Sequence, residues 1–592
     1  MTARRGDENA PKKVKKRYIA SLDGLRALAV IAVICYHLDL KFALGGLLGV
    51  TVFFVLSGYL ITGLLMAELE ETGTVNLPQF WLRRVRRLFP AIVLAVVVVT
   101  ALCVLFTHPL LPKLRPDVGP SLFWFQNWWY VFRGLSYFES LGDPSPLTHF
   151  WSLAIEEQFY LVWPILLLLV SKLGASKNVI RRGCLILAVI SAALMWVLYN
   201  PLEDPTRVYY GTDTRACSLL IGAWLSLFWP GQALTEQGTR NVPSRTINLL
   251  DVIGVLSLAG IICMMAFIDG FSGFMYHGGI VICSVLTAVL IAVLVHPRSR
   301  LAKFASLKPF VWIGQRSYGI YLWHWPLWIL SSALAPKIFK AVGPWPLIMT
   351  ALLTAIAVMI SWLMVGKPAA THSAVSVVGP LRTNKKNHVA RVIAVDVILV
   401  LSLAGCVQGI AHAPAKTAMQ IQLEQQAAQL ERMQKTEHVL LRHAVPAPPK
   451  PKHEMPTGDQ ITAIGDSVML ASSQGLSEVF PGIQTDASVS RSIMVAPELI
   501  GNALSAGSLR QWVLIGLGTN SAITPDQLDQ IRNMIGPDRV LVLVNAHGDR
   551  TWIPPTNQVL ADYAAAHPDN VVLVDWDATA NANAQVLGSD GI

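Results

Sequence analysis

The sequence predicts a two-part protein, with a polytopic all-α membrane domain followed by an α/β domain of three layers. Of the 592 residues, 53% are hydrophobic and only 14% are charged, and the mean hydropathy of +0.48 is typical of a chain with many spans. The stretch 457–592 instead has ordinary globular composition. Its apolar runs at 460–465, 511–516, 539–545 and 570–575 alternate with helical stretches, which predicts a parallel sheet between two layers of helices.

Eleven apolar segments are predicted as membrane-spanning helices. With the N-terminus in the cytoplasm, the loops expected inside carry about 27 Lys and Arg, against about 7 in the loops expected outside, as the positive-inside rule requires. An odd number of spans then places the C-terminal domain outside the cell, in a multi-pass protein of the cell membrane. The segments lie at 19–38, 44–66, 89–107, 149–170, 181–199, 215–229, 248–268, 275–295, 317–335, 345–366 and 390–411.

Changes of composition along the chain predict its domain boundaries. The net charge of +10 lies mostly in the inside loops, so it indicates topology and not nucleic-acid binding. All seven cysteines fall in or beside apolar segments and lack metal-ligand spacing, so we expect no metal. The apolar segments themselves make a lipid bilayer the expected partner. No oligomeric state follows from the sequence. The expected parts are a basic cytoplasmic tail at 1–18, a membrane domain at 19–370, a cytoplasmic loop at 371–389, the last span at 390–411, a helical and then Pro-rich linker at 412–456, and the extracellular domain at 457–592.

The expected outside loop at 108–148 carries an aromatic run at 123–130, with the sequence FWFQNWWY. Such a run is typical of the aromatic belt at a membrane interface. The alternative is a re-entrant segment or a platform for sugar rings.

The first predicted span contains two ionisable residues, Arg26 and His37. Such a side chain inside a span costs free energy and indicates a function. Eleven residues apart, the two fall on nearly one helix face, separated by about 16 Å along the axis. We expect Arg26 to hold the anionic part of a donor bound from inside, with the reactive end near His37. Alternatively, Arg26 snorkels or pairs with Asp23, and His37 is a helix-end histidine.

Five motifs follow one another in the membrane part. They are SLDGLRA at 21–27 with His37, FFVLSGYLI at 53–61, RRVRRLFP at 83–90, FWSLAIEEQFY at 150–160 and SYGIYLWH at 317–324. Together they resemble the membrane-bound acyltransferase family 3 over about residues 18–370. The resemblance implies transfer of acyl groups, usually acetyl from acetyl-CoA, onto extracytoplasmic glycans, with His37 and Arg26 as the essential pair of the first span.

The same resemblance suggests further site residues. The basic run Arg83, Arg84, Arg86 and Arg87 would meet the phosphates of CoA, although such a run is also a common topology signal. Glu156 and Glu157 would shape the site, or would instead cap the fourth spanning helix. The family's last span commonly ends in Glu-Lys-Pro, and here Gly366 replaces the glutamate, which puts a role for that position in doubt.

In the soluble part, Ser467 follows a strand-like run and a Gly-Asp turn and opens a helix. A serine at a helix N-terminus is placed as a nucleophile whose backbone N–H can stabilise an oxyanion. Downstream lie Gly518-Thr519-Asn520 and, at the end of the chain, Asp590. These motifs resemble the SGNH hydrolases. The resemblance implies Ser467 as nucleophile, Asn520 and the backbone of Ser490 as oxyanion donors, and Asp590 as the acid of an Asp-x-x-His block.

The histidine of that block would be residue 593, and the sequence stops at Ile592. We therefore expect an incomplete, C-terminally truncated domain that is impaired in transfer, because serine needs a histidine to take its proton. The soluble part also offers His547 as a substitute base.

The combination of both parts resembles the peptidoglycan O-acetyltransferases of Gram-positive bacteria. It implies a two-stage path, in which acetyl crosses from acetyl-CoA to Ser467 and then to a muramic acid hydroxyl of peptidoglycan, which confers lysozyme resistance. Rival interpretations are acetylation of teichoic acid or capsule, a membrane-anchored esterase, or a transporter with a glycan-binding domain.

Overall fold

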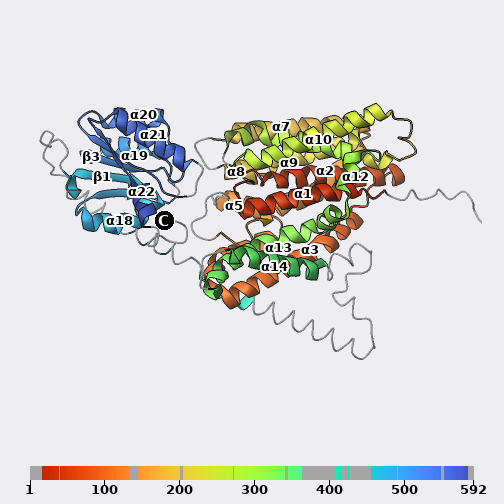
Figure 1. The fold of residues 1–592 in the computed structure, drawn as a ribbon, viewed down its shortest axis with the longest axis horizontal. Coiled ribbons are helices and arrows are strands. Elements are labelled where there is room, and N and C mark those ends of the chain that lie inside the picture. The colour runs from red at the N-terminus through yellow and green to blue at the C-terminus, as the bar shows by residue number, and fades with distance from the viewer. Residues whose placement is uncertain are drawn as a thin grey trace, which may run out of the picture.

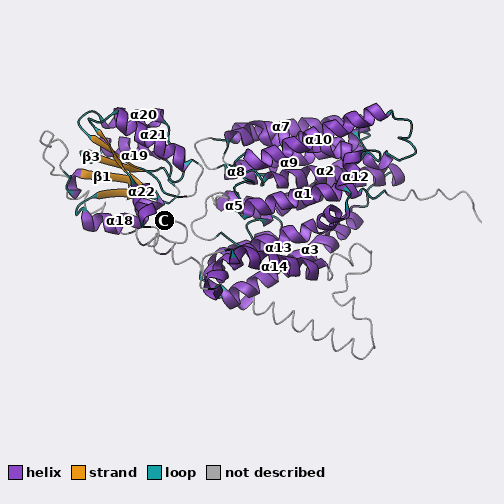
Figure 2. Cartoon of the chain, in the orientation of Figure 1, coloured by secondary structure: helices purple, strands orange, loops and turns teal. Residues whose placement is uncertain are grey.

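The structure is a computed structural model that forms two groups of elements, a helical group and a group built around a five-stranded sheet (Figures 1 and 2). It describes residues 17–38, 40–133, 144–200, 205–270, 272–339, 344–362, 407–409, 411–414, 455–489, 491–548 and 552–583, together with the single positions 421, 425 and 428. The long helices of the first group are α1 (Ala20–His37), α2 (Leu48–Thr72), α3 (Leu77–Phe106), α6 (Phe150–Lys172), α7 (Lys177–Leu198), α9 (Thr212–Phe228), α10 (Ser244–Phe267), α11 (Ile280–Leu294), α13 (Lys308–Phe339) and α14 (Trp345–Ser361).

Ten of the eleven predicted spans coincide with these helices, and the eleventh, at 390–411, lies almost entirely outside the described residues. Within the described part, seven helical stretches are long and apolar enough to cross a membrane by length and composition alone. These are α1, α2, α3, α6, α7, α10 and the continuous stretch Met275–Leu294, which joins η3 (Met275–Gly279) to α11. The total of eleven stays a prediction.

The basic run at 83–87 lies inside a helix, which corrects its expected position in a loop at 67–88. The helix α3 begins at Leu77, a turn and a half before Arg83. Its start is fixed by Asn76, whose side chain accepts a hydrogen bond from the Gln79 N–H at 3.0 Å, with Pro78 in the first turn. The run is therefore a helical extension of the third predicted span.

Short helices occupy the aromatic loop between α3 and α6, namely η1 (His108–Leu110), α4 (Leu111–Leu122) and α5 (Gln126–Arg133). Gln126 and Asn127 are fully buried, and Asn127 Nδ2 donates to the Tyr210 carbonyl at 3.0 Å. Phe123 and Phe132 are instead 75% and 79% exposed. Polar residues thus tie this segment to the bundle, and part of the aromatic run faces outward, while Tyr130 is buried; the exposed rings fit the aromatic-belt interpretation.

Within this loop, a buried carboxyl group of α4 accepts a hydrogen bond from a tyrosine of α5. The Tyr130 hydroxyl donates to Asp117 at 2.5 Å, and burial raises the pKa of Asp117 to about 6. The remaining short elements are α8 (Thr206–Tyr210), η2 (Gly231–Ala233) and α12 (Arg300–Ala305).

Glycines allow the closest helix crossings in the bundle. A Cβ on Gly58 of α2 would lie 1.9 Å from the Leu219 carbonyl oxygen of α9, and one on Gly222 would lie 2.0 Å from that of Val55. A Cβ on Gly314 of α13 would likewise lie 1.8 Å from the backbone oxygen of Asp23 in α1. No side chain larger than hydrogen fits these points, as is common where membrane helices pack closely.

The second group contains β1 (Ile461–Gly465), β2 (Gln484–Ala487), β3 (Trp512–Gly516), β4 (Val540–Val544) and β5 (Val571–Val574), in the order β2-β1-β3-β4-β5 with every pairing parallel. The four predicted strands are confirmed as β1, β3, β4 and β5. The edge strand β2 was not predicted, because its sequence Gln-Thr-Asp-Ala lacks an apolar pattern.

Helices cover both faces of this sheet (Figure 1). On one face, side chains of the inner strands pack against α19 (Ala496–Ser505), α20 (Pro525–Ile535) and α21 (Ile553–Ala566). On the other, Ala463 and Leu514 pack against α18 (Ser467–Val479). The predicted three-layer arrangement is therefore present. The remaining elements are η6 (Gly458–Gln460), η7 (Ile493–Val495) and α22 (Trp576–Ala582).

We predict that Gly58→Ala and Gly222→Ala each lower the unfolding free energy by about 1–3 kcal/mol, because the added methyl overlaps a backbone carbonyl that cannot move independently. Thermal unfolding of the detergent-solubilised protein measures this. Gly183→Ala on α7 is the matched control, since its Cβ meets nothing within 4 Å, and we expect no loss there. Equal melting temperatures for all three variants would contradict the role of these crossings.

Candidate active site

His37, the last residue of α1, pairs with a second histidine, His324 of α13. Its Nδ1 lies 2.7 Å from His324 Nε2, and the two rings stack with centroids 5.0 Å apart. The Trp325 ring covers His37 at 4.6 Å. His324 is 3% exposed, so this contact lies in the interior of the bundle.

A third histidine, His149, completes this group, which we call the histidine cluster (His37, His149 and His324). The His149 ring lies 5.7 Å from that of His324, and its Nε2 donates to the Leu322 carbonyl at 3.2 Å. The Tyr321 hydroxyl donates to the His149 carbonyl at 3.0 Å and lies 2.6 Å from Ser152 Oγ. These bonds fix the start of α6 against α13.

A line of polar side chains continues along α6 from the histidine cluster. Ser152, Glu156 and Tyr160 are spaced four residues apart and therefore share one helix face, with a rise of about 6 Å per step. Ser57 of α2 donates to Glu156 Oε1 at 3.0 Å, and the Tyr160 hydroxyl donates to Oε2 at 3.1 Å. Each polar group on this face, which we call the α6 polar line, is thus hydrogen-bonded inside the protein.

The position of Glu156 and Glu157 speaks against the capping alternative. The helix α6 begins at Phe150, so both residues lie in its second turn and outside the region where a carboxylate satisfies free N–H groups. Glu157 is 8% exposed. Both carboxyl groups are therefore interior groups, as expected of residues that shape a site.

The basic residues of the predicted donor site have partners. Arg26 Nη1 lies 3.2 Å from Asp23 Oδ1, so the pairing alternative is present. Arg83 pairs with Glu68 at 3.5 Å, and the guanidinium of Arg84 lies over the Tyr160 ring at 5.7 Å. Arg84 thus contacts the Tyr160 end of the α6 polar line, whereas Arg86 and Arg87 are exposed.

Arg215 of α9 is fully buried in the same bundle. Its Nη2 donates to Thr51 at 3.0 Å, and the guanidinium is stacked between the rings of Phe54 and Tyr209 at 5.5 and 5.0 Å. Among the described residues, its Nε and Nη1 have no hydrogen-bond acceptor. A buried cation that is compensated only in part costs free energy, which makes this region a candidate for function.

Ser467 lies where β1 ends and α18 begins. Asp466 is the N-cap, and its Oδ1 accepts from the Val468 N–H at 2.9 Å. A Cβ on Gly465 would lie 2.4 Å from Met469 Cβ, so only glycine allows this tight turn. Burial raises the pKa of Asp466. Ser467 is therefore the first residue of a capped helix, at the carboxyl edge of the sheet.

Asn520 lies beside the loop that follows β2, the loop to which the predicted oxyanion donor Ser490 belongs in the sequence. Asn520 Nδ2 donates to the Arg491 carbonyl at 3.2 Å. Arg491 in turn pairs with Asp486 at 2.9 Å and donates to the Asp486 carbonyl at 2.7 Å. The ends of β1, β2 and β3 thus bring these segments to one edge. Ser490 and Asp590 lie outside the described residues.

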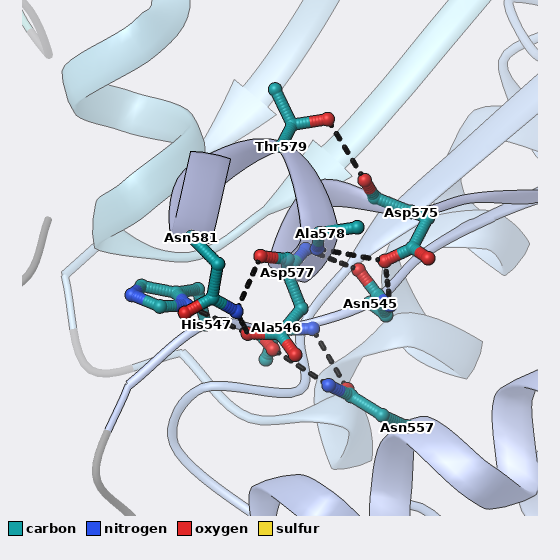
Figure 3. A network of polar contacts seen from close by, with 9 residues as sticks. All are labelled: Asn545, Ala546, His547, Asn557, Asp575, Asp577, Ala578, Thr579 and Asn581. Carbon is teal, nitrogen blue, oxygen red and sulfur yellow. Dashed lines mark hydrogen bonds and ion pairs between the residues drawn. The ribbon is translucent and has the colours of Figure 1, made fainter. Parts of the chain in front are cut away.

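His547 is bound to an acid that the sequence did not predict. Its Nδ1 lies 2.6 Å from Asp577 Oδ1, at the start of α22 (Figure 3). Asn545 joins the same network, accepting from the Asp577 N–H and donating to Asp575, both at 2.8 Å. Hydrogen bonds to Asn545 and the Ala578 N–H lower the pKa of Asp575.

This network holds His547 on the β5 side of β4. Strand spacing separates the backbones of β4 and β1 by about 10 Å, with β3 between them. The contacts therefore support a structural role, in which His547 fastens α22 to the sheet.

Sequence analysis missed the partners His149, His324, Arg215 and Asp577. One signal was available, because His324 ends the SYGIYLWH motif and, like His37, is an ionisable residue inside an odd-numbered predicted span. Within the described residues, no group of three or more His, Cys, Asp or Glu is placed to hold a metal.

Comparisons with known proteins agree with this architecture. The family described as "Acyltransferase domain" matches residues 19–366. The chain is 35% identical to peptidoglycan O-acetyltransferase OatA of Listeria monocytogenes, over 98% of this chain and 96% of the relative. It is 33% identical to O-acetyltransferase OatA of Staphylococcus aureus, over 98% and 94%.

One solved structure, the C-terminal catalytic domain of Streptococcus pneumoniae peptidoglycan O-acetyltransferase A with a methylsulfonyl adduct, matches at 26% identity and a TM-score of 0.21. The match covers 23% of this chain and 80% of that one. On the family match and the near full-length identity to these relatives, the chain belongs to the membrane-bound acyltransferase family 3, and it is an O-acetyltransferase.

Proposed function

We propose that this enzyme moves acetyl groups from cytoplasmic acetyl-CoA to Ser467 on the outer side of the membrane, and from Ser467 to a hydroxyl of muramic acid in peptidoglycan. The observation that carries the proposal is the joining, in one chain, of a buried histidine cluster in an acyltransferase bundle to a serine at a strand–helix turn. The names of the relatives support peptidoglycan as the acceptor.

The first stage takes place in the bundle. The donor enters from the cytoplasmic side, with its phosphates near the Arg84 end of the α6 polar line and its thioester near His37. His37 removes the proton of the Ser467 hydroxyl, which attacks the carbonyl carbon of the thioester. The new bond to the Ser467 oxygen replaces the bond to sulfur, and the proton passes to the departing thiolate. The placement of the α6 polar line, with Tyr160 beside Arg84 at one end and Ser152 beside Tyr321 at the other, supports this position of the donor.

The second stage takes place at the sheet edge. Ser467 holds the acetyl group as an ester, and its own N–H and the Asn520 amide stabilise the oxyanion that forms when the sugar hydroxyl attacks. In this proposal the histidine expected three residues after Asp590 takes the proton of the sugar hydroxyl and returns it to the departing Ser467 oxygen, and Asp590 orients that histidine. The backbone of Ser490 is a further donor, and His547 with Asp577 is a structural pair.

The proposed topology places the N-terminus in the cytoplasm and residues 457–592 outside, after a last span at 390–411. The distribution of Lys and Arg supports this arrangement. The contacts between α1 and α13 also fit it. Asp23 meets Gly314 and His37 meets His324, so the two helices run parallel, as a first and a ninth span do.

We predict that Ser467→Ala lowers ester-linked acetate on peptidoglycan by about 10³-fold or more, to the background of a host without an enzyme of its own, because the acyl-enzyme cannot form. Acetate released by mild alkali from purified muropeptides measures this. Ser472→Ala, an exposed serine five residues along α18, is the control and should keep full activity.

The same assay separates the acceptors. Acetate on teichoic acid or capsule with unmodified muramic acid would reject peptidoglycan as the acceptor. Full activity of Ser467→Ala would reject the serine relay altogether and would favour the transporter interpretation.

We predict that His37→Ala lowers the rate of CoA release from acetyl-CoA by about 10²- to 10⁴-fold, since it removes the base of the first stage. A thiol assay on the full chain in proteoliposomes measures this rate. His108→Ala changes an exposed histidine of η1 and should behave as the unmodified protein. An esterase on a membrane anchor would not need His37, and full activity of His37→Ala would support that rival.

A further inference from the structure

We propose that His324 is a positioning residue that fixes the tautomer of His37, so that the lone pair of His37 lies on Nε2. This inference rests on the proposed function, since it concerns how His37 acts as a base. It starts from one contact, the 2.7 Å separation between His37 Nδ1 and His324 Nε2, in which only one of the two nitrogens can be the donor.

The opposite nitrogen of His324 decides which one donates. His324 Nδ1 lies 2.7 Å from the Tyr321 carbonyl oxygen and 3.2 Å from that of Ile320. Carbonyl oxygens accept hydrogen bonds and cannot donate, so His324 Nδ1 carries a hydrogen. With 3% of the residue exposed, the uncharged ring is favoured, because burying an imidazolium is costly. A neutral His324 with a hydrogen on Nδ1 has its lone pair on Nε2.

The tautomer of His37 follows from this assignment. Because His324 Nε2 accepts, His37 Nδ1 must donate, and a neutral His37 then has its lone pair on Nε2. The chain of bonds runs from the Tyr321 carbonyl to His324 and on to His37. It has the form of a catalytic triad in which a third group orients the base, with an imidazole in the place of the carboxylate.

The surroundings of His324 explain why this orientation is stable. Its Nδ1 bonds are to the preceding turn of its own helix, so its ring cannot flip without losing both. The Tyr321 hydroxyl bonds the His149 carbonyl, and Trp325 Nε1 donates to the Ser145 carbonyl at 3.0 Å, which anchors this turn of α13 on both sides. When His37 takes a proton on Nε2, its Nδ1–H keeps the same acceptor, so the proton transfer requires no rearrangement.

The test compares two replacements of His324 that differ in one property. In His324→Gln, the amide oxygen takes the place of Nε2 and still accepts from His37, whereas His324→Leu has similar bulk and no acceptor. With acetyl-CoA as donor and CoA release by the full chain as the readout, we expect kcat to fall on the order of 10²-fold for His324→Leu and by less than about 10-fold for His324→Gln. We expect KM for acetyl-CoA to change little in either, because neither replacement touches the donor's anionic end.

A spectroscopic measurement reads the tautomer directly and does not depend on turnover. In the ¹⁵N spectrum of the full chain with labelled histidine, the His37 signals are identified by their loss in His37→Ala. We expect a protonated Nδ1 and an unprotonated Nε2 in the unmodified protein, and a mixture of tautomers in His324→Leu. A His37 protonated on Nε2 in the unmodified protein would overturn the inference even if His324→Leu fails to fold.

The outcomes separate this inference from the proposed function. Loss of CoA release in His37→Ala with an unchanged kcat in His324→Leu would reject the role of His324 and leave the proposed function intact. Full CoA release in His37→Ala would reject the proposed function itself. Equal losses in His324→Gln and His324→Leu would show that His324 acts through packing, and would also reject the assignment.

Discussion

Hydrocarbon supplies no hydrogen bonds, so each polar side chain inside the bundle must find its partner in the protein. The α6 polar line meets this constraint with partners on α13 and α2 for its side chains, and the backbone of its last residue is bonded to α3. Ser152 bonds Tyr321 of α13, Glu156 bonds Ser57 of α2, and the Tyr160 backbone accepts from Trp81 of α3. The polar side chains of the candidate site therefore also hold the surrounding helices together. Replacing any one of these side chains would affect helix packing as well as the site.

The geometry of the histidine cluster is set partly by contacts far from it. At one end of the α1–α13 pair, the Gly314 position lies against the Asp23 backbone, and at the other His37 meets His324. Two parallel helices held at two separated points have little freedom to slide. A 2.7 Å hydrogen bond between two rings requires such control, because it is lost with a displacement of about 1 Å. The glycine contact therefore helps to hold the geometry on which the proposed chemistry at the other end depends.

Sequence reasoning gave correct results wherever the signal is local. Ten of the eleven segments that were predicted as spans from the length of their apolar runs are helices, and four strands were predicted from short apolar runs between helical stretches. It failed where the structure or role of a segment depends on a partner that is distant in the sequence. The polar edge strand β2 is stabilised by β1, and the pairing of His37 with His324 joins residues 287 positions apart. The start of α3 was misplaced because hydropathy does not register the Asn76 cap, which begins the helix before its apolar part. Asp577 was not predicted because no sequence motif links it to His547, which lies 30 residues earlier in the chain.

The two sites differ in construction, and the difference follows from where each operates. In the bundle, the groups of the histidine cluster are side chains, with 1–3% exposure at His149 and His324, and exclusion of water would protect the thioester of the proposed donor from hydrolysis. At the sheet edge, Ser467 depends on backbone geometry, with a capped helix N-terminus and a glycine turn. Ser467 is only 6% exposed, so this geometry is held within the fold of the sheet domain, where it would serve the proposed exchange with a glycan hydroxyl. In the proposed two-stage path, each acyl exchange would therefore have a site of different construction, one made by side chains packed between helices and one made by the backbone at a strand–helix turn.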